Sequence, residues 1–152
     1  MSDNVFDFET AFLSVDSQEK GSEFEPVNDD GKKSGFVIRL AGPDSERRRK
    51  TSARLQDFYL KSGLVGGGSA PKNRRERRAA KSDAQYTGDT AEKMRELRMD
   101  DMVAATISWR YPNGFQGPEC TAENVRALYE KHPTLFEQVA DAADDLDRFT
   151  KR

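Results

Sequence analysis

The clearest periodic pattern of apolar residues lies near the C-terminus, between Thr121 and Phe149. Apolar side chains recur there at three- and four-residue steps, the spacing that places them on one face of an α-helix. Pro133 disfavours helix at the preceding His132 but suits the first turn of a new helix. The pattern therefore predicts two helices that break at His132-Pro133, with Thr121 as the N-cap of the first. The core residues predicted here are Val125, Leu128, Leu135, Val139, Leu146 and Phe149.

Residues 90–110, TAEKMRELRMDDMVAATISWR, predict another helix. Its second half is apolar on nearly every side, so we expect this to be the most buried helix of the chain. The core residues predicted in it are Met94, Leu97, Ile107 and Trp109.

A third helical pattern covers residues 45–62, with a narrow apolar stripe formed by Leu55, Phe58 and Tyr59. The first turns of this helix carry a basic run at residues 47–50, which is unfavourable at the positive end of a helix dipole. We interpret the run as a solvated face, and contact with an acidic surface is the alternative.

Strand-like alternation appears once, in residues 24–40, which predict a β-hairpin. The stretch Asn28-Asp29-Asp30-Gly31 supplies turn residues, and Phe36, Ile38 and Leu40 would share one side of the second strand. Pro26 confines the first strand to a sheet edge. Because two isolated strands are marginal in water, the hairpin must pack on helices or on another copy.

The combined pattern predicts a mostly α fold, a small helical domain of about four to five helices with an N-terminal β-hairpin. Residues 1–23 are expected to be a flexible acidic tail, in which Phe8 and Phe12 would share a helix face. A short segment that orders on a partner is the alternative for this tail. The remaining predicted units are the hairpin plus basic helix (24–62), a flexible linker with a basic segment (63–88) and a C-terminal helical domain (89–152).

Composition narrows the function classes. Hydrophobic residues make up 35% of the chain and charged residues 34%, which limits the core and predicts that part of the chain stays unpacked. The single cysteine, Cys120, excludes an intramolecular disulfide, and the single histidine, His132, has no partner at metal-ligand spacing. We therefore predict no catalytic site, no metal, no cofactor and no enzyme activity.

Neither a membrane segment nor a secretion signal is evident. The longest apolar runs fall well short of the roughly 20 residues that cross a bilayer. The N-terminal residues MSDNVFDFET lack the basic and apolar regions of a signal peptide, so we predict a soluble protein that is not secreted.

The densest charge run is KNRRERRAAK, residues 72–81, with six basic residues and one acidic residue. Such a run can neutralise phosphates, but aromatic residues do not interleave for base stacking, and no known DNA-reading motif frames it. A plain solvated segment is the first interpretation, an acidic protein surface the second and nucleic acid the third.

The order of short motifs in the C-terminal half resembles the tail assembly chaperones of long-tailed (siphovirus-type) bacteriophages. The likeness begins with ISW, ending at Trp109, and continues through a turn-rich loop to TAENVRALY (121–129) with a proline shortly after. It ends in D-x-x-x-F, Asp145 to Phe149, and a weaker likeness covers FVIRLAGPDS, residues 36–45. The chain departs from the family in having Ser108 where a glycine often precedes the tryptophan, and in its long basic insert.

The resemblance implies a small helical protein, made in the host cytoplasm, that binds the tape-measure protein and keeps it soluble while the tail tube polymerises. It also implies possible contact with the tail-tube protein and absence from the mature virion. A virion structural protein (head–tail or tail) and a nucleic-acid-binding accessory protein acting through residues 72–81 are the alternatives. The sequence does not indicate the oligomeric state. Reasoning from expected exposure selects these partner contacts: Arg74, Arg75, Arg77, Arg78, Tyr129 and Phe136.

Overall fold

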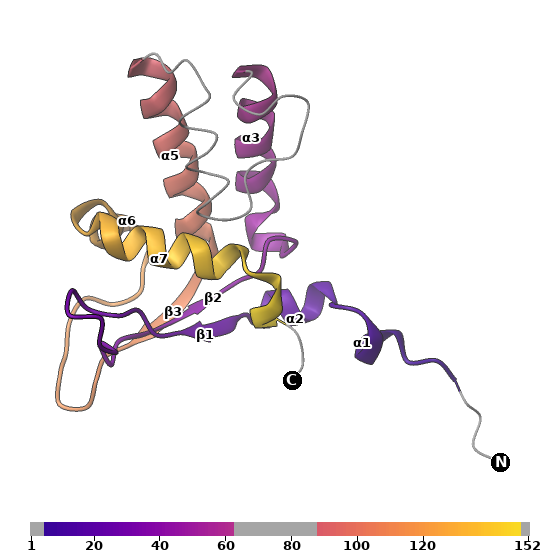
Figure 1. Cartoon of the computed structure of the whole chain (residues 1–152), viewed down its shortest axis with the longest axis horizontal. Coiled ribbons are helices and arrows are strands. Elements are labelled where there is room, and N and C mark those ends of the chain that lie inside the picture. Colours follow the sequence, from indigo (N-terminus) through magenta and orange to yellow (C-terminus); the bar gives the residue numbers. More distant parts are fainter. Residues whose placement is uncertain (1–4, 63–87, 150–152) are drawn as a thin grey trace.

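The structure is a computed structural model that describes residues 5–62 and 88–149, and its fold is mostly α with a small antiparallel sheet (Figure 1). The helices are α1 (Phe8–Ala11), α2 (Val15–Lys20), α3 (Glu46–Ser62), α5 (Gly88–Ala105), α6 (Ala122–Lys131) and α7 (Pro133–Asp144). The 3-10 turn η1 (Leu146–Phe149) follows α7, and the strands are β1 (Ser22–Phe24), β2 (Val37–Leu40) and β3 (Thr106–Arg110). The fold class predicted from the sequence is confirmed.

The sheet has the order β1-β2-β3, with β2 in the centre and both neighbours antiparallel to it. Ile38 faces Phe24 on one side and Trp109 on the other, and it is fully buried together with Leu40. The predicted hairpin is therefore present, although its first strand is β1, which ends before Pro26. The third strand supplies the support that an isolated hairpin lacks.

The helix predicted over residues 90–110 is wrong in its last five residues, because α5 ends at Ala105 and β3 begins at Thr106. Thr106, Ile107 and Trp109 are β-branched or aromatic, types that favour strands when a neighbouring strand is present. That neighbour is β2, more than sixty residues earlier in the chain, so the local pattern does not contain it. The Thr106 hydroxyl donates to the Met102 carbonyl at 2.8 Å where the helix ends.

One hydrophobic core lies between the sheet and helices α5, α6 and α7 (Figure 1). It joins Ile38 and Leu40 to residues from all three helices, so the two segments that the sequence pattern divided, 24–62 and 89–152, share a single core. Its buried members are Ile38, Leu40, Met99, Met102, Ala105, Val125, Tyr129, Phe136, Val139, Ala140, Ala142 and Ala143.

Most of the predicted core residues lie where we expected. Five are buried, namely Met94, Leu97, Val125, Val139 and Phe149. Four are half-buried, namely Ile107, Trp109, Leu128 and Leu135. The prediction for Leu146 is wrong, since its side chain is 45% exposed. The reason is that α7 ends at Asp144, and the tighter 3-10 turn that follows places its side chains at a different angular spacing from an α-helix.

The local signals at the C-terminal helices are confirmed. The Thr121 side chain accepts a hydrogen bond from the Asn124 backbone N–H, which caps α6. Helix α6 ends at Lys131, and Pro133 occupies the first turn of α7.

The predicted N-terminal tail is too long, because residues 15–23 belong to the fold. Gln18 is only 2% exposed, and its side-chain carbonyl accepts from the Asp44 backbone N–H at 2.7 Å. The Gln18 side-chain amide donates to the Asp44 carboxylate at 3.1 Å, and the Gln18 backbone carbonyl accepts from the Gly42 N–H at 3.0 Å. These bonds fix α2 to the loop before α3. The predicted linker covers residues 63–88, of which 63–87 lie outside the described residues and Gly88 begins α5.

Gly21 offers a direct test of how closely α2 and the sheet approach each other. Its φ is +79°, and a Cβ there would lie 2.5 Å from the Leu40 carbonyl oxygen and 2.7 Å from the Ile107 Cδ1. Gly31 has a φ of +78° but would have no neighbour within 4 Å of a Cβ. We expect Gly31→Ala to cost about 1–2 kcal/mol through its left-handed backbone alone. Gly21→Ala should cost a further 1–3 kcal/mol, roughly, through overpacking.

Urea-induced unfolding of both variants measures the two losses. Equal losses at the two glycines would show that the close approach of Gly21 to β2 and β3 is not a constraint on the fold.

Candidate functional site

Residues 5–12, here called the aromatic segment, project from the folded body (Figure 1). Its rings are largely open to solvent, with Phe6, Phe8 and Phe12 exposed by 60%, 67% and 65%. They cluster with one another, since the ring centroids of Phe6 and Phe8 lie 4.9 Å apart and those of Phe8 and Phe12 lie 6.3 Å apart. When a partner covers aromatic rings that lie outside the core, the burial of their surface favours binding.

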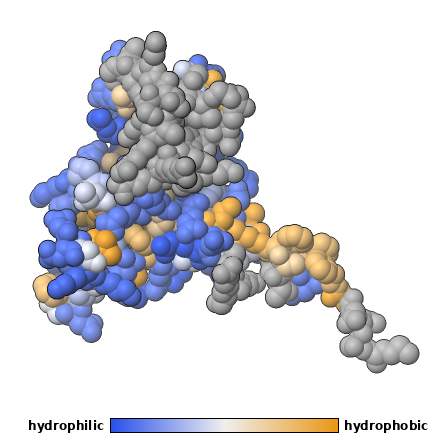
Figure 2. All heavy atoms as spheres, in the orientation of Figure 1, coloured by the Kyte–Doolittle hydropathy of each residue, from blue (hydrophilic) through white to orange (hydrophobic). Residues whose placement is uncertain are grey.

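The apolar surface continues onto the body beyond the aromatic segment. Val15 at the start of α2 and Leu146 in η1 are each 45% exposed, and both line a groove of about 630 Å³. Pro43 and Leu55 line the same groove, which lies between α2, α3 and η1. Figure 2 shows hydrophobic atoms over the projecting segment and over the adjoining edge of the body. We call this surface, made by Phe6, Phe8, Phe12, Val15 and Leu146, the apolar face.

A buried ion cluster forms the inner wall of the same groove. Arg48 is 2% exposed, and its Nε and Nη2 donate to the two carboxylate oxygens of Asp101 at 3.2 and 2.8 Å. Nη2 also donates to Asp144 at 2.8 Å, and Nη1 donates to the Ala143 carbonyl at 2.9 Å. The guanidinium therefore joins α3, α5 and the end of α7. We call this cluster of Arg48, Asp101 and Asp144 the arginine clasp.

The electrostatics of the arginine clasp are those of a structural contact. Burial is the largest influence and disfavours the charged guanidinium, yet the charges and hydrogen bonds of Asp101 and Asp144 together raise the pKa of Arg48 above its ordinary value. Asp101 also accepts from the hydroxyls of Thr51 at 2.8 Å and Ser52 at 3.2 Å. Because these charges are paired and hydrogen-bonded, the clasp positions three helices and offers no evident group for reaction.

The prediction of a solvated face for the basic run at the start of α3 is correct for three of its residues and wrong for the fourth. Arg47, Arg49 and Lys50 are exposed, as a solvated face predicts. The same interpretation is wrong for Arg48, which contacts an acidic pair within its own chain. The signal that was missed is Asp101, a carboxylate within the most apolar part of a helix, which needs a cation when it is buried.

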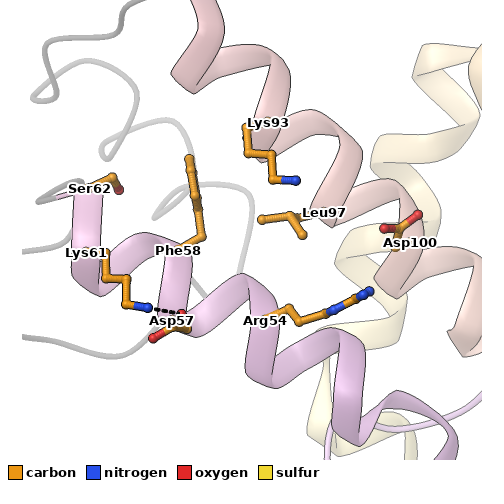
Figure 3. A pocket seen from close by; sticks show the side chains of 8 residues that line it. All are labelled: Arg54, Asp57, Phe58, Lys61, Ser62, Lys93, Leu97 and Asp100. Atoms are coloured by element: carbon orange, nitrogen blue, oxygen red, sulfur yellow. Dashed lines mark ion pairs between the residues drawn. The ribbon is translucent and has the colours of Figure 1, made fainter.

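A second hollow of about 550 Å³ lies between α3 and α5 (Figure 3). Phe58 and Leu97 give it an apolar floor, while Lys61 pairs with Asp57 at 3.0 Å. Its other charged lining residues are Arg54, Lys93 and Asp100. Cations and carboxylates both line this hollow, so its charge does not select a ligand of either sign.

Tyr129 and Phe136, selected from the sequence as exposed partner contacts, are wrongly placed by that prediction. Tyr129 is 1% exposed and Phe136 is 7% exposed. The Tyr129 hydroxyl lies 2.6 Å from the Thr106 hydroxyl. The rings of Tyr129 and Phe136 pack edge to face with centroids 6.0 Å apart. Burial, the largest influence, raises the pKa of Tyr129, and the hydrogen bond with Thr106 opposes that rise. Both residues belong to the apolar stripes of α6 and α7, and these stripes face the core.

The single cysteine and the single histidine lie outside the apolar face and the arginine clasp. Burial raises the pKa of the Cys120 thiol, and the charge of Arg47 opposes this only in part, so thiolate formation is disfavoured. His132 is exposed at the junction of α6 and α7. Within residues 5–62 and 88–149, no group of three or more histidine, cysteine, aspartate or glutamate side chains is arranged to hold a metal ion. In the same ranges, no helix has the length and apolar character needed to cross a bilayer.

Comparison of the chain with protein-family models, curated proteins and solved structures found no match in any of the three. The likeness to tail assembly chaperones therefore stays a prediction that rests on the order of the motifs. The predicted basic contacts Arg74, Arg75, Arg77 and Arg78 lie outside the described residues. The apolar face is the partner-binding candidate that the geometry provides. Its sequence signal was the spacing of Phe8 and Phe12 in an otherwise polar stretch.

Removing the cation of the arginine clasp should destabilise the fold strongly. In Arg48→Met, Asp101 and Asp144 lose their shared counter-charge in a buried site, so we expect a loss of about 3–5 kcal/mol. Arg49→Met, one residue along the same helix and exposed, should change stability by no more than about 0.5 kcal/mol. Chemical denaturation of both variants measures the difference. A loss below about 1 kcal/mol for Arg48→Met would contradict the assignment of the clasp as a central contact.

Proposed function

We propose that this protein is an assembly chaperone of a long-tailed bacteriophage, which binds the tape-measure protein and keeps it soluble until the tail tube polymerises around it. The single observation that supports this most is the apolar face, where three phenylalanine rings stand outside the core beside an open groove. The motif order in residues 107–149 supports the family assignment. On this proposal the protein acts in the host cytoplasm, has the tail-tube protein as a second candidate partner, and is absent from the mature virion.

The chemistry of the apolar face suits a helical partner. A long helical protein exposes apolar stripes before it is enclosed, and such stripes bind by inserting residues spaced at three or four positions into apolar surface. Phenylalanine rings bring a large contact area, and they lose little conformational entropy when they are ordered because each has only two side-chain torsions. Charged residues make up 34% of the chain, which favours solubility of the complex that results.

Rigidity of the body supports the same role. The bonds of Gln18 fix α2, and the arginine clasp fixes the end of α7 just before Leu146. Val15 and Leu146 are thus held in place before a partner arrives. Preorganisation of this kind lowers the entropy lost on binding, and it leaves only the aromatic segment to be ordered.

Replacing the exposed rings should abolish chaperone action without unfolding the body. For the variant Phe6→Ser, Phe8→Ser, Phe12→Ser we expect the affinity for a tape-measure fragment to fall by at least thirtyfold, equivalent to about 2 kcal/mol. Co-expression should then return the fragment to the insoluble fraction, whereas the unaltered protein yields a soluble complex. Calorimetric titration of the purified fragment gives the affinity.

Phe115→Ser is the matched control, because Phe115 is 70% exposed in the loop after β3, on a segment far along the chain from the apolar face. This variant should bind like the unaltered protein. The proposal fails if the unaltered protein leaves the fragment insoluble, or if the triple serine variant rescues it equally well.

Two further results would direct the assignment to the alternatives. Recovery of the chain from purified virus particles would favour a structural tail or head–tail protein. Binding to duplex DNA that weakens with salt, and that is lost when Arg74, Arg75, Arg77 and Arg78 become glutamine, would favour a nucleic-acid-binding protein.

A further inference from the structure

We propose that the groove between α2, α3 and η1 is the acceptor for the aromatic segment of a second copy of this chain, so that the free protein forms a two-fold symmetric dimer by exchanging these segments. The inference concerns the protein without its partner and does not depend on the chaperone role. The donor is the aromatic segment with Phe6, Phe8 and Phe12. The acceptor is the open rim of the groove, where Val15 and Leu146 are each 45% exposed.

The donor segment and the acceptor groove lie next to each other on one chain, which favours a second copy of the chain as the partner. Val15 lines the groove and lies three residues after Phe12, so the projecting segment emerges at the margin of the groove itself. A two-fold axis beside this margin would bring each segment to the groove of the other copy. Such an interface is self-complementary, because the same surface supplies both halves of each contact.

Charge is complementary as well. The aromatic segment, residues 5–12, contains two acidic residues, Asp7 and Glu9, and no basic residue. On the acceptor side Arg49 is exposed and lines the groove. The carboxylates that line the groove are already engaged by cations or amides of the same chain. Asp101 and Asp144 accept from Arg48, and Asp44 accepts from the Gln18 amide. An acidic, aromatic segment therefore meets apolar side chains and a positive charge at this rim.

The area involved is comparable with that of a small dimer interface. A fully buried phenylalanine removes about 150–250 Å² from solvent. Seating three rings of the observed exposure in each of two grooves would bury on the order of 1,000–1,400 Å² in total, counting the rings and the groove lining. Specific, stable interfaces bury roughly 1,200–2,000 Å², so the exchange reaches the lower end of the range in which two copies associate.

Sedimentation equilibrium of the purified full chain tests the dimer. Over a hundredfold range of concentration, the average mass should rise from that of one chain towards that of two. A donor variant (Phe6→Ser, Phe8→Ser, Phe12→Ser) and an acceptor variant (Val15→Asp, Leu146→Asp) should each raise the dissociation constant at least tenfold. Phe115→Ser should leave it unchanged. A chain that remains monomeric throughout, or a dimer that survives either variant, overturns the proposal.

Mixing separates exchange from simple stacking of rings against rings. The donor variant keeps an intact groove and the acceptor variant keeps an intact segment, so their mixture contains one complete donor–acceptor pair. Fluorescence transfer between labelled copies should report a heterodimer in the mixture, at a concentration where neither variant pairs with itself. If the mixture shows no fluorescence transfer at the concentration that fully dimerises the unaltered chain, the proposed exchange of segments is overturned. No tape-measure fragment is present in these experiments. A monomeric chain would therefore not contradict the chaperone proposal, and a failure of the chaperone proposal would not change the interpretation of the dimer measurement.

Discussion

A guanidinium held between two carboxylates is the contact on which the rest of this structure depends. Arg48 links α3 to Asp101 of α5 and to Asp144 at the end of α7, and almost no solvent reaches it. Buried ions are costly to desolvate, so this pairing adds little net stability compared with a well-packed apolar core. Its main effect is on specificity, because it disfavours other packings of the three helices. An arrangement of the three helices that separates these charges while keeping them buried leaves an ion without compensation, and the observed packing avoids that cost.

The exposed apolar surface is a consequence of that packing. The clasp and the bonds of Gln18 satisfy polar groups behind the groove, and Val15, Pro43 and Leu146 form an apolar part of its rim. The aromatic segment in front of it has little contact with the body, and segments of that kind open and reorder at low free-energy cost. The molecule thus combines a rigid acceptor with an adaptable donor. That combination suits a protein whose work is to cover apolar surface for a limited time.

Features written in local sequence were predictable, and features that depend on distant partners were not. The cap at Thr121 and the break at Pro133 follow from side-chain and backbone chemistry within a few residues, and both are confirmed. Strand β3 was missed because its partner β2 lies far away in the chain, although Thr106 and Ile107 carry strand propensity. The clasp was missed because a basic run on a helix is most often solvated.

The candidate site shows the same division. Tyr129 and Phe136 lie on the periodic stripes of their helices, and this spacing favours the core positions that they occupy. Phe8 and Phe12 have helical spacing too, yet α1 is short and no second stripe faces it. Exposure is decided by whether a neighbour arrives, which spacing alone does not specify. A stripe therefore predicts that a face will be covered, and the tertiary structure decides whether by the same chain or by another.

Hydrogen–deuterium exchange with and without a tape-measure fragment tests the central claim most directly, at a concentration low enough to keep the chain monomeric. In the free protein, amides of residues 5–12 should exchange rapidly and those of α5, α6 and α7 slowly, because only the latter lie in the core. Adding the fragment should slow exchange in residues 5–12 and at the start of α2. Protection that appears elsewhere, with the aromatic segment still exchanging freely, would contradict the account.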